Sequence, residues 1–245
     1  MPSLPFNPET DTLDAFHAGK FYLVQPKAGG HRSGMDAMML AACVPPDFRG
    51  NVADLGGGAG AAALAVASRC SQTRVTIVEN CPHMLGYAQK TLSLQQNCHL
   101  SSRLSIVAAD VYWPGKQRQK AGLYENSFDF VVCNPPFNGK NYQASAKPVR
   151  AHAHHMPEEF FNQWVKTACA LLHAKGYFAI IARPSSLEPV LNACKKRFQR
   201  IRILPLCSYK NQAASRLLLT AQKGRRTPLE IYPPLILHQN KQNKW

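Results

Sequence analysis

The order of hydrophobic and polar positions predicts two kinds of element that alternate along most of the chain. Short runs of apolar and β-branched residues are typical of buried strands, and longer segments with apolar residues at helical spacing are typical of helices. The predicted strands span residues 21–25, 51–55, 74–79, 104–110, 128–133, 177–182, 201–206 and 217–220. The predicted helices span residues 34–43, 61–69, 82–97, 157–173 and 186–197. This alternation predicts an α/β fold with a mostly parallel sheet and helices on both faces.

The end of the predicted sheet differs from the rest. Residues 201–206 and 217–220 are close enough in sequence to pair as an antiparallel hairpin. The strands from residue 51 onward therefore predict a seven-stranded sheet whose last strand is antiparallel. Residues 1–20 are polar, acidic and contain prolines, which indicates a loose leading segment. We divide the chain into an N-terminal segment, residues 1–46, and one domain, residues 47–245.

The predicted helix at residues 34–43 has a start and a stop signal. Ser33 is followed three residues later by Asp36, ahead of an apolar run, which fits a capping box with Asp in place of the usual Glu. Pro45 and Pro46 end the helix.

The charge of the chain indicates a polyanionic partner. Lys and Arg number 29 and Asp and Glu 14, so the formal net charge is +15 and the pI is about 9.7. Such an excess attracts nucleic acid above all. Residues 189–229 contain no Asp or Glu. Their basic residues are Lys195, Lys196, Arg197, Arg200, Arg202, Lys210, Arg216, Lys223, Arg225 and Arg226.

The cysteines, the histidines and the apolar runs of the chain bear on its compartment, on membrane association and on metal binding. The eight cysteines contain no CxxC pair and mostly lie in apolar contexts, which favours free thiols in a reducing cytoplasm. No apolar run approaches the roughly 20 residues of a membrane span, so no membrane association is expected. His152, His154 and His155 lack a Cys or acid at ligand spacing, so no metal site is predicted.

A glycine-rich turn joins the predicted strand 51–55 to the helix after it. Asp54 precedes Gly56, Gly58 and Gly60 at alternate positions. Glycines at such a turn let the backbone bend tightly and let a ligand approach it closely. Gly56 and Gly58, with Ala61 in the third place, also satisfy the dinucleotide pattern. A tight turn without a ligand is the alternative interpretation.

An acid ends each of the next two predicted strands. Glu79 ends the strand 74–79 and Asp110 ends the strand 104–110. A carboxylate in the first position can accept hydrogen bonds from ribose hydroxyls, and one in the second can accept from an adenine amino group. The glycine turn and both acids come directly after parallel strands and so belong to one edge of the sheet. Together they predict a cofactor that contains adenosine.

The fourth strand of the sheet, residues 128–133, ends in Asn134, Pro135, Pro136 and Phe137. Prolines cannot donate to a ladder and stop the strand. The Asn134 side-chain oxygen and the Pro135 carbonyl can both accept N–H bonds from a planar amine and orient its lone pair, which can contribute several kcal/mol without a base. Phe137 can stack on a nucleobase, worth about 1–3 kcal/mol. Asn is neutral, so no general-base role is assigned to it.

Over roughly residues 30–222 these features resemble the class I S-adenosylmethionine-dependent methyltransferases, which have a Rossmann-like sheet. The resemblance implies that Asp54, Gly56, Gly58 and Gly60 line the methionine moiety of S-adenosylmethionine. It also implies that Glu79 binds ribose and that Asp110 meets adenine. A NAD-dependent oxidoreductase is the competing interpretation, but it would not explain the residues 134–137.

The residues 134–137 look like the (N/D)PP(Y/F) motif of methyltransferases that act on planar amino or amide nitrogens. The segment with Arg32, Gly34 and Asp36 is similar to one in bacterial tRNA(Val) adenine-N6-methyltransferases. That resemblance implies N6 of adenine 37 in a tRNA anticodon loop as the acceptor. It also implies cofactor contacts from Gly34 and Asp36 and a helix in residues 1–46 that covers the cofactor.

The expected partner is RNA, most of all tRNA, and no obligate protein partner is evident. The expected substrate-binding residues are Arg32, Lys140, Arg150, Lys210 and Arg216. Three alternatives stay open. Phe at position 137 also occurs in guanine-N2 methyltransferases of ribosomal RNA, protein glutamine-N5 methyltransferases use the same Asn-Pro-Pro geometry, and an RNA-binding protein could retain the fold without activity.

Overall fold

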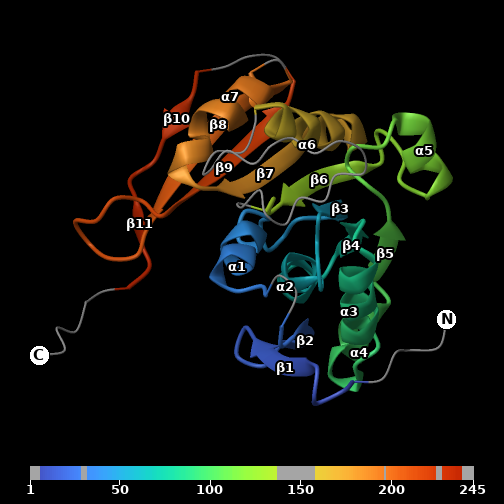
Figure 1. The fold of residues 1–245 in the computed structure, drawn as a ribbon. Coiled ribbons are helices and arrows are strands. Elements are labelled where there is room, and N and C mark those ends of the chain that lie inside the picture. Colours follow the sequence, from blue (N-terminus) through green and yellow to red (C-terminus); the bar gives the residue numbers. More distant parts are fainter. Residues whose placement is uncertain (1–5, 29–31, 137–157, 196, 225–227, 239–245) are drawn as a thin grey trace, which may run out of the picture.

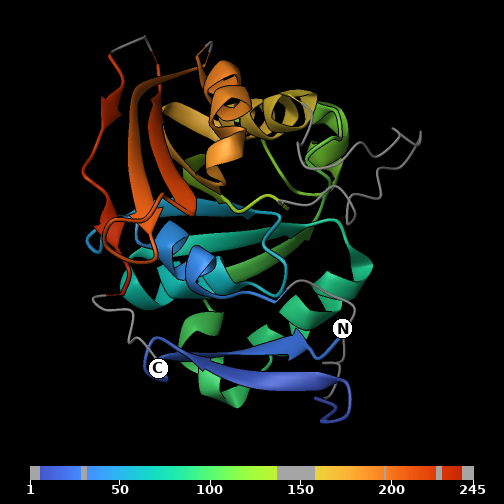
Figure 2. The same cartoon turned by 60° about the vertical axis from the view of Figure 1, so that its left-hand side comes forward.

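The computed structural model describes residues 6–28, 32–136, 158–195, 197–224 and 228–238 (Figure 1). One large sheet runs through the molecule, with helices on each of its faces, and a separate two-stranded hairpin lies against the helices of one face (Figures 1 and 2). This confirms the predicted α/β architecture.

The central strands of the sheet lie in the order β8-β9-β7-β6-β3-β4-β5. They are β3 (Gly50–Leu55), β4 (Thr73–Glu79), β5 (Leu104–Ala108), β6 (Phe128–Cys133), β7 (Leu172–Ala182), β8 (Phe198–Cys207) and β9 (Arg216–Lys223). Strand β9 is antiparallel to both β7 and β8, and the other neighbouring pairs are parallel. The mostly parallel sheet and its antiparallel hairpin are therefore confirmed.

Two short strands extend this sheet from seven strands to nine within the described residues. Strands β10 (Glu230–Ile231) and β11 (Leu235–Ile236) both pair in parallel with β8. The antiparallel β9 is thus not the last strand in the chain. Pro233 and Pro234 lie between these two strands. Each strand has only two residues, and a hydrophobic pattern cannot predict so short an element.

The helices divide between the two faces of the sheet. They are α1 (Met35–Ala41), α2 (Ala61–Arg69), α3 (Pro82–Leu92), α4 (Cys98–Ser101), α5 (Gly115–Lys120), α6 (Glu158–Leu171) and α7 (Leu187–Cys194). Successive side chains of β6 point to opposite faces of the sheet, so this strand contributes to the hydrophobic core on each face. Val131 and Cys133 pack with α6 and α7, whereas Phe130 and Val132 pack with α1 and α2.

The described part of the leading segment, residues 6–20, contains a strand, which corrects the prediction of a loose segment there. Within it, β1 (Asp11–Phe16) pairs in antiparallel register with β2 (Phe21–Pro26). The hairpin packs against α2 and α3 (Figure 2). Val24 of β2 belongs to one buried cluster with Ala59, Met84 and Tyr87, so the hairpin and the glycine turn share a small core.

A buried acid explains why β1 was missed. Asp11 is 1% exposed and accepts hydrogen bonds from Lys90 Nζ at 2.7 Å and Tyr87 Oη at 3.0 Å. Burial by itself raises the pKa of Asp11, but hydrogen bonds from the Asn7 backbone, Lys90, Thr10 and Tyr87 outweigh it and lower the pKa to about 2. An acid at a buried strand position hides the alternation, and its partners lie on a helix far along the chain.

Several element boundaries also differ from the prediction by a few residues. The helix expected at 82–97 ends at Leu92, and a 3-10 turn (Gln95–Asn97) comes after it. In this turn the Asn97 side chain bonds to both the N–H and the C=O of Tyr22 in β2. The helix expected to reach residue 173 ends at Leu171, where β7 begins. Helix α5 lies between residues 110 and 128, where the sequence predicted no helix or strand.

The capping box predicted for Ser33 and Asp36 is wrong. Gly34 is the N-cap of α1, and no side chain caps the helix. The Asp36 carboxylate accepts a hydrogen bond from Arg216 Nε at 2.8 Å instead, because the start of β9 lies beside the first turn of α1. Among the described residues, no helix combines the length and hydrophobicity that a membrane crossing requires.

Replacing Asp11 by Asn should lower the free energy of unfolding by about 2 kcal/mol at pH 7. The folded-state pKa lies below the value of 3.8 for an unperturbed Asp, so this contribution is present above about pH 4 and is lost as the pH falls toward 2. Urea unfolding of both proteins between pH 7 and pH 3 measures it. The exposed Glu9→Gln is the control, and an Asp11→Asn effect that does not shrink with falling pH would contradict the assignment.

Candidate active site

The carboxyl ends of four parallel strands bring the predicted site residues to one edge of the sheet. Leu55 at the end of β3 is in register with Cys133 of β6 on one side and Val78 of β4 on the other. Glu79 is in register with Ala108 of β5. The glycine turn, Glu79, Asp110 and Asn134 therefore lie along one edge, as the sequence predicted.

The glycine turn is bent by left-handed backbone conformations. The φ angles are +67° at Gly56, +56° at Gly58 and +93° at Gly60, a region that residues with a Cβ rarely adopt. The N–H groups of Gly56 and Gly57 both donate to the carbonyl oxygen of Val78, at 2.8 and 3.1 Å. Gly60 is the N-cap of α2 and brings no side chain to the helix end. The glycine N–H groups that donate within the turn keep its shape, and the N–H groups at the N-terminus of α2 can hold a ligand.

Asp54 lies beneath the turn and holds it. The carboxylate is buried and accepts a hydrogen bond from the Ala63 N–H of α2 at 3.0 Å. Burial raises the pKa of Asp54 to about 7; the Ala63 N–H opposes this rise, and the nearby negative charge of Glu79 adds to it. The structure shows a support for the turn, and a direct contact of Asp54 with the cofactor stays a prediction.

Glu79 is fixed by three backbone donors. Its Oε2 accepts from the Gly58 N–H at 2.9 Å, and its Oε1 accepts from Asn80 N–H at 2.9 Å and Cys81 N–H at 2.8 Å. The carboxylate is thus oriented by the strand end and by the glycine turn together. A carboxylate has about two acceptor sites on each oxygen, so Oε2, which accepts only one of these bonds, can also accept from a ligand hydroxyl.

Asn80 joins the two acids and was missed by the sequence analysis. Its Nδ2 donates to Asp110 Oδ2 at 3.0 Å, and Asp110 Oδ1 accepts from the Tyr112 N–H at 2.8 Å. An amide directly after the acid that ends a strand was the available signal. Glu79, Asn80 and Asp110 form one hydrogen-bonded row along the edge.

Asn134 carries an unsatisfied acceptor. Its Oδ1 is buried, and no group of the described chain donates a hydrogen bond to it. A buried acceptor without a donor is costly, and native proteins retain few of them. Pro135 is buried and Pro136 is partly buried, so the chain leaves β6 in a fixed direction. Phe137 lies outside the described residues.

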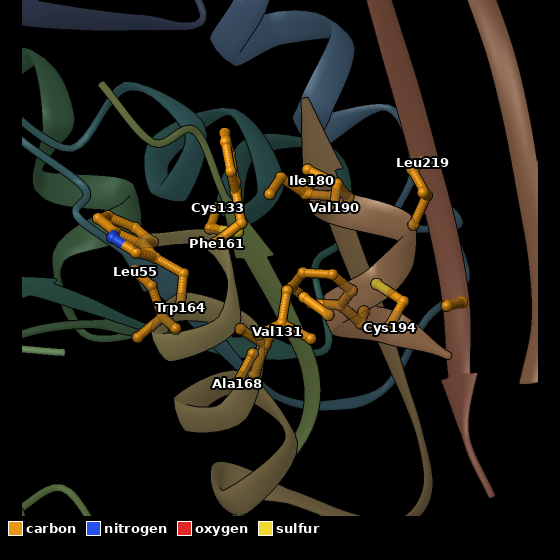
Figure 3. Packing of buried hydrophobic residues seen from close by; sticks show 14 of the residues in the cluster. Leu55, Val131, Cys133, Phe161, Trp164, Ala168, Ile180, Val190, Cys194 and Leu219 are labelled. Atoms are coloured by element: carbon orange, nitrogen blue, oxygen red, sulfur yellow. The ribbon is translucent and has the colours of Figure 1, made fainter. Parts of the chain in front are cut away.

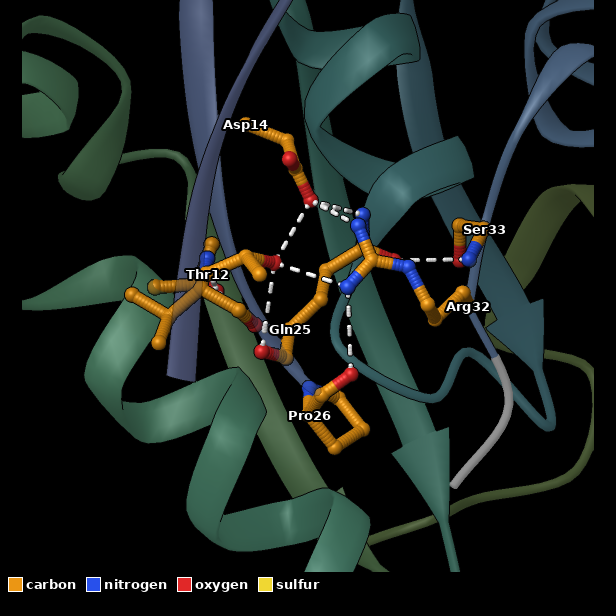
Figure 4. Close-up of polar contacts among 8 residues, drawn as sticks. Thr12, Asp14, Gln25, Pro26, Arg32 and Ser33 are labelled. Carbon is orange, nitrogen blue, oxygen red and sulfur yellow. Dashed lines mark hydrogen bonds and ion pairs between the residues drawn. The ribbon is translucent and has the colours of Figure 1, made fainter. Parts of the chain in front are cut away.

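The remaining predicted residues fall into three groups. Arg32 donates to Asp14, Thr12 and the Pro26 carbonyl, which ties it to the hairpin (Figure 4). Gly34 and Asp36 begin α1, and Asp36 pairs with Arg216 at the start of β9. Lys210 is exposed in the β8–β9 connection. The cofactor and substrate contacts of these residues are untested and stay predictions.

The directions of the strands place two of the predicted substrate-binding residues at the edge of the sheet that holds the candidate site. Strand β9 is antiparallel to both β7 and β8, so the end of β8 and the start of β9 share the edge that holds Asn134. Lys210 and Arg216 therefore lie on the same edge as the candidate site. Lys140 and Arg150, like His152, His154 and His155, are outside the described residues. In the described part of the chain, no three His, Cys, Asp or Glu residues gather in a way that could hold a metal ion.

Comparison with known proteins identifies the family. Residues 34–204 match the model of the methyltransferase small domain. The chain belongs to this family. The predicted methyltransferase class is thereby confirmed.

Three similar proteins are all named methyltransferases, and their names differ in the atom that receives the methyl group. A tRNA1(Val) (adenine(37)-N6)-methyltransferase of Shewanella halifaxensis is 29% identical, over 73% of this chain and 70% of its own length. A predicted O-methyltransferase from Agrobacterium tumefaciens is 34% identical, with a TM-score of 0.73 over 85% of this chain and 90% of its own. The fold also matches a Thermus thermophilus 16S rRNA N2 G1207 methyltransferase, at 21% identity and a TM-score of 0.58 over 90% of this chain and 52% of its own.

Asp54→Asn should change how stability depends on pH. The folded-state pKa of Asp54 is raised above the value of 3.8 for an unperturbed Asp, so the folded protein binds this proton more tightly and loses stability as the pH rises from about 4 to about 7. Asn keeps an oxygen for the Ala63 N–H and does not titrate. Relative to the variant, the unchanged protein should lose about 1 kcal/mol per pH unit in this window.

Thermal or urea unfolding of both proteins from pH 5 to pH 8 measures this difference. Asp129→Asn, which changes an acid at the opposite end of β6, is the control. Parallel stability curves for Asp54→Asn and the unchanged protein would show that Asp54 does not titrate in this range.

Proposed function

We propose that this protein transfers a methyl group from S-adenosylmethionine to N6 of adenine 37 in the anticodon loop of a tRNA. The buried Oδ1 of Asn134 carries this proposal. Among the described residues it is a hydrogen-bond acceptor without a donor, and it lies at the strand end where we expect the amine that receives the methyl group. The family supports methyl transfer, and relatives named tRNA1(Val) (adenine(37)-N6)-methyltransferase support the base.

The cofactor would lie along the edge of the sheet that holds the glycine turn and the two acids. The backbone of Gly56 to Gly60 would hold the methionine part, Glu79 the ribose and Asp110 the adenine amino group. The sulfonium supplies an activated methyl group. We further propose that residues 1–46 act as a cover, with Gly34 and Asp36 at its inner end, because Val24 of β2 shares a buried cluster with Ala59 of the glycine turn.

The residues of the chain orient the amine rather than deprotonate it. An exocyclic amine on a purine is a weak nucleophile because its lone pair is delocalised into the ring. When its two N–H groups donate to Asn134 Oδ1 and to the Pro135 carbonyl, the lone pair faces the methyl group. The nitrogen lone pair forms the N–C bond, the S–C bond breaks with its electrons going to sulfur, and the nitrogen releases one proton to water.

An amine with two N–H donors explains Asn134 better than a hydroxyl acceptor would. A hydroxyl has one proton, which it can give to one acceptor only. The proposal therefore differs from the O-methyltransferase description of the Agrobacterium protein. The proposal places both acceptors, Asn134 and Pro135, on one substrate group.

Charge favours RNA over a protein substrate. Lys210 is exposed on the site edge, and the net charge of the chain is +15. A glutamine-N5 protein methyltransferase has no need of such an excess. A single-stranded loop can splay its base out for edge contacts and stacking, as the site requires. The guanine-N2 reaction named for the Thermus protein is the second candidate within RNA.

Asn134→Ala should lower the rate of methyl transfer to tRNA by at least roughly 100-fold, because it removes one of two groups that orient the amine. Binding of S-adenosylhomocysteine, measured by calorimetry, should stay within about twofold. Single-turnover transfer of labelled methyl gives the rate. The control is Asn192→Ala on α7, which removes an amide bonded to Lys195 on the surface. A near-normal rate in Asn134→Ala would refute the mechanism.

The affinity for RNA should fall steeply as salt is added, because phosphate contacts release counterions. Lys210→Ala should reduce the slope of log affinity against log salt by about one. Filter binding with unmodified tRNA between low and moderate salt measures both slopes. Lys20→Ala at the turn between β1 and β2 is the matched control, and a flat response of the unchanged protein would argue against a nucleic acid substrate.

A further inference from the structure

Trp164 of α6 is a polar side chain in the core that the proposed function does not use. It is 6% exposed and packs in the cluster formed by β3, β6 and α6 (Figure 3). Its ring lies 5.7 Å from that of Phe160, centroid to centroid. In Figure 3 the indole nitrogen lies on the side of the ring that faces away from Phe161 and Cys133.

The Trp164 ring reaches the glycine turn. A Cβ placed on Gly56 would lie 2.5 Å from Cη2 of Trp164 and 3.1 Å from its Cζ3. The first distance is shorter than a Cβ atom shows in real structures, so the ring occupies the space that a side chain at Gly56 would take. Trp164 therefore touches the first glycine of the turn at the site edge.

The same helix also contacts the chain that follows β5. Gln163 Nε2 donates to the Val111 carbonyl at 3.0 Å, and Thr167 Oγ1 donates to it at 2.7 Å. Val111 directly follows Asp110, the acid predicted to meet adenine. Helix α6 thus contacts the chain after β3 and the chain after β5, with Trp164 on the side of Gly56.

The indole N–H of Trp164 has no partner among the described residues. Nε1 is buried, and no acceptor of the described chain lies within hydrogen-bond distance. Indole nitrogen is a donor only, so an acceptor has to come from outside this set. Filling the core would not require the N–H, because Phe or Leu packs without the cost of an unpaired donor. The unpaired donor therefore points to an acceptor on a ligand.

We propose that Trp164 is a cofactor-binding residue whose indole N–H donates a hydrogen bond to an acceptor atom in the adenosine part of S-adenosylmethionine. The inference rests on the proposed placement of the cofactor along the edge from Gly56 to Asp110. The adenosine part is the partner because α6 bridges the two turns between which that part would lie. A turn-supporting role alone would leave the N–H without a function.

The direct test monitors the indole N–H signals of the unsubstituted, ¹⁵N-labelled protein by NMR. The chain has three Trp residues, Trp113, Trp164 and Trp245, and Trp113→Phe and Trp164→Phe assign the signals. The Trp164 signal should move downfield on adding S-adenosylhomocysteine or 5′-methylthioadenosine, which lacks the amino acid part. It should stay in place with methionine.

A Trp164 signal that does not respond, or that responds only to ligands with the methionine part, would overturn the inference. Calorimetry with S-adenosylhomocysteine on the same sample separates two failures. If the ligand does not bind, the proposed function fails as well. If it binds and the Trp164 signal does not move, only the role of Trp164 fails.

Affinity gives a second readout. Trp164→Phe removes the N–H and should weaken S-adenosylhomocysteine binding roughly fivefold, as expected for one lost hydrogen bond. The matched substitution Trp113→Phe should leave the affinity unchanged. An affinity in Trp164→Phe equal to that of the unsubstituted protein would contradict the proposed hydrogen bond.

Discussion

Two hydrogen bonds to one carbonyl oxygen, from the N–H groups of Gly56 and Gly57 to Val78, bend the chain over the end of β4. Only a left-handed residue at Gly56 allows this bend. A Cβ at Gly57 would lie 2.8 Å from Ile77 Cγ2 and 3.0 Å from Asp54 Oδ2, so this position has no room for a side chain either. The bend places the Gly58 N–H on the Glu79 carboxylate, which makes the glycine turn and the proposed ribose acid one hydrogen-bonded unit.

Helix α6 connects this unit to the rest of the site. Its Trp164 lies against Gly56, and Gln163 and Thr167 hold the carbonyl of the residue after Asp110. At its other end, the carbonyls of Ala170 and Leu171 accept from the N–H groups that lead into β6, the strand that presents Asn134. One helix therefore contacts the chain after β3, the chain after β5 and the chain that enters β6, and a shift of α6 would be felt at all three places.

Local signals in the sequence were enough to predict the strands and helices that carry the site. The bounds of α2 and β6 agree with the prediction because a glycine turn and a proline pair mark them. Strand β1 was missed because the burial of Asp11 depends on Lys90, a partner on α3. Trp164 was missed because an aromatic residue at helical spacing is typical of any core, and its unpaired N–H exists only in three dimensions. Strands β10 and β11 form only because the edge of β8 is available to pair.

Adenine N6 in RNA is the methyl acceptor that we propose for Asn134. The most direct measurement is nucleoside mass spectrometry of an unmodified tRNA(Val) transcript after incubation with the protein and methyl-labelled S-adenosylmethionine. We expect label in N6-methyladenosine alone, mapped to the base beside the anticodon. Label in N2-methylguanosine, or unlabelled RNA in the presence of bound cofactor, would contradict this assignment.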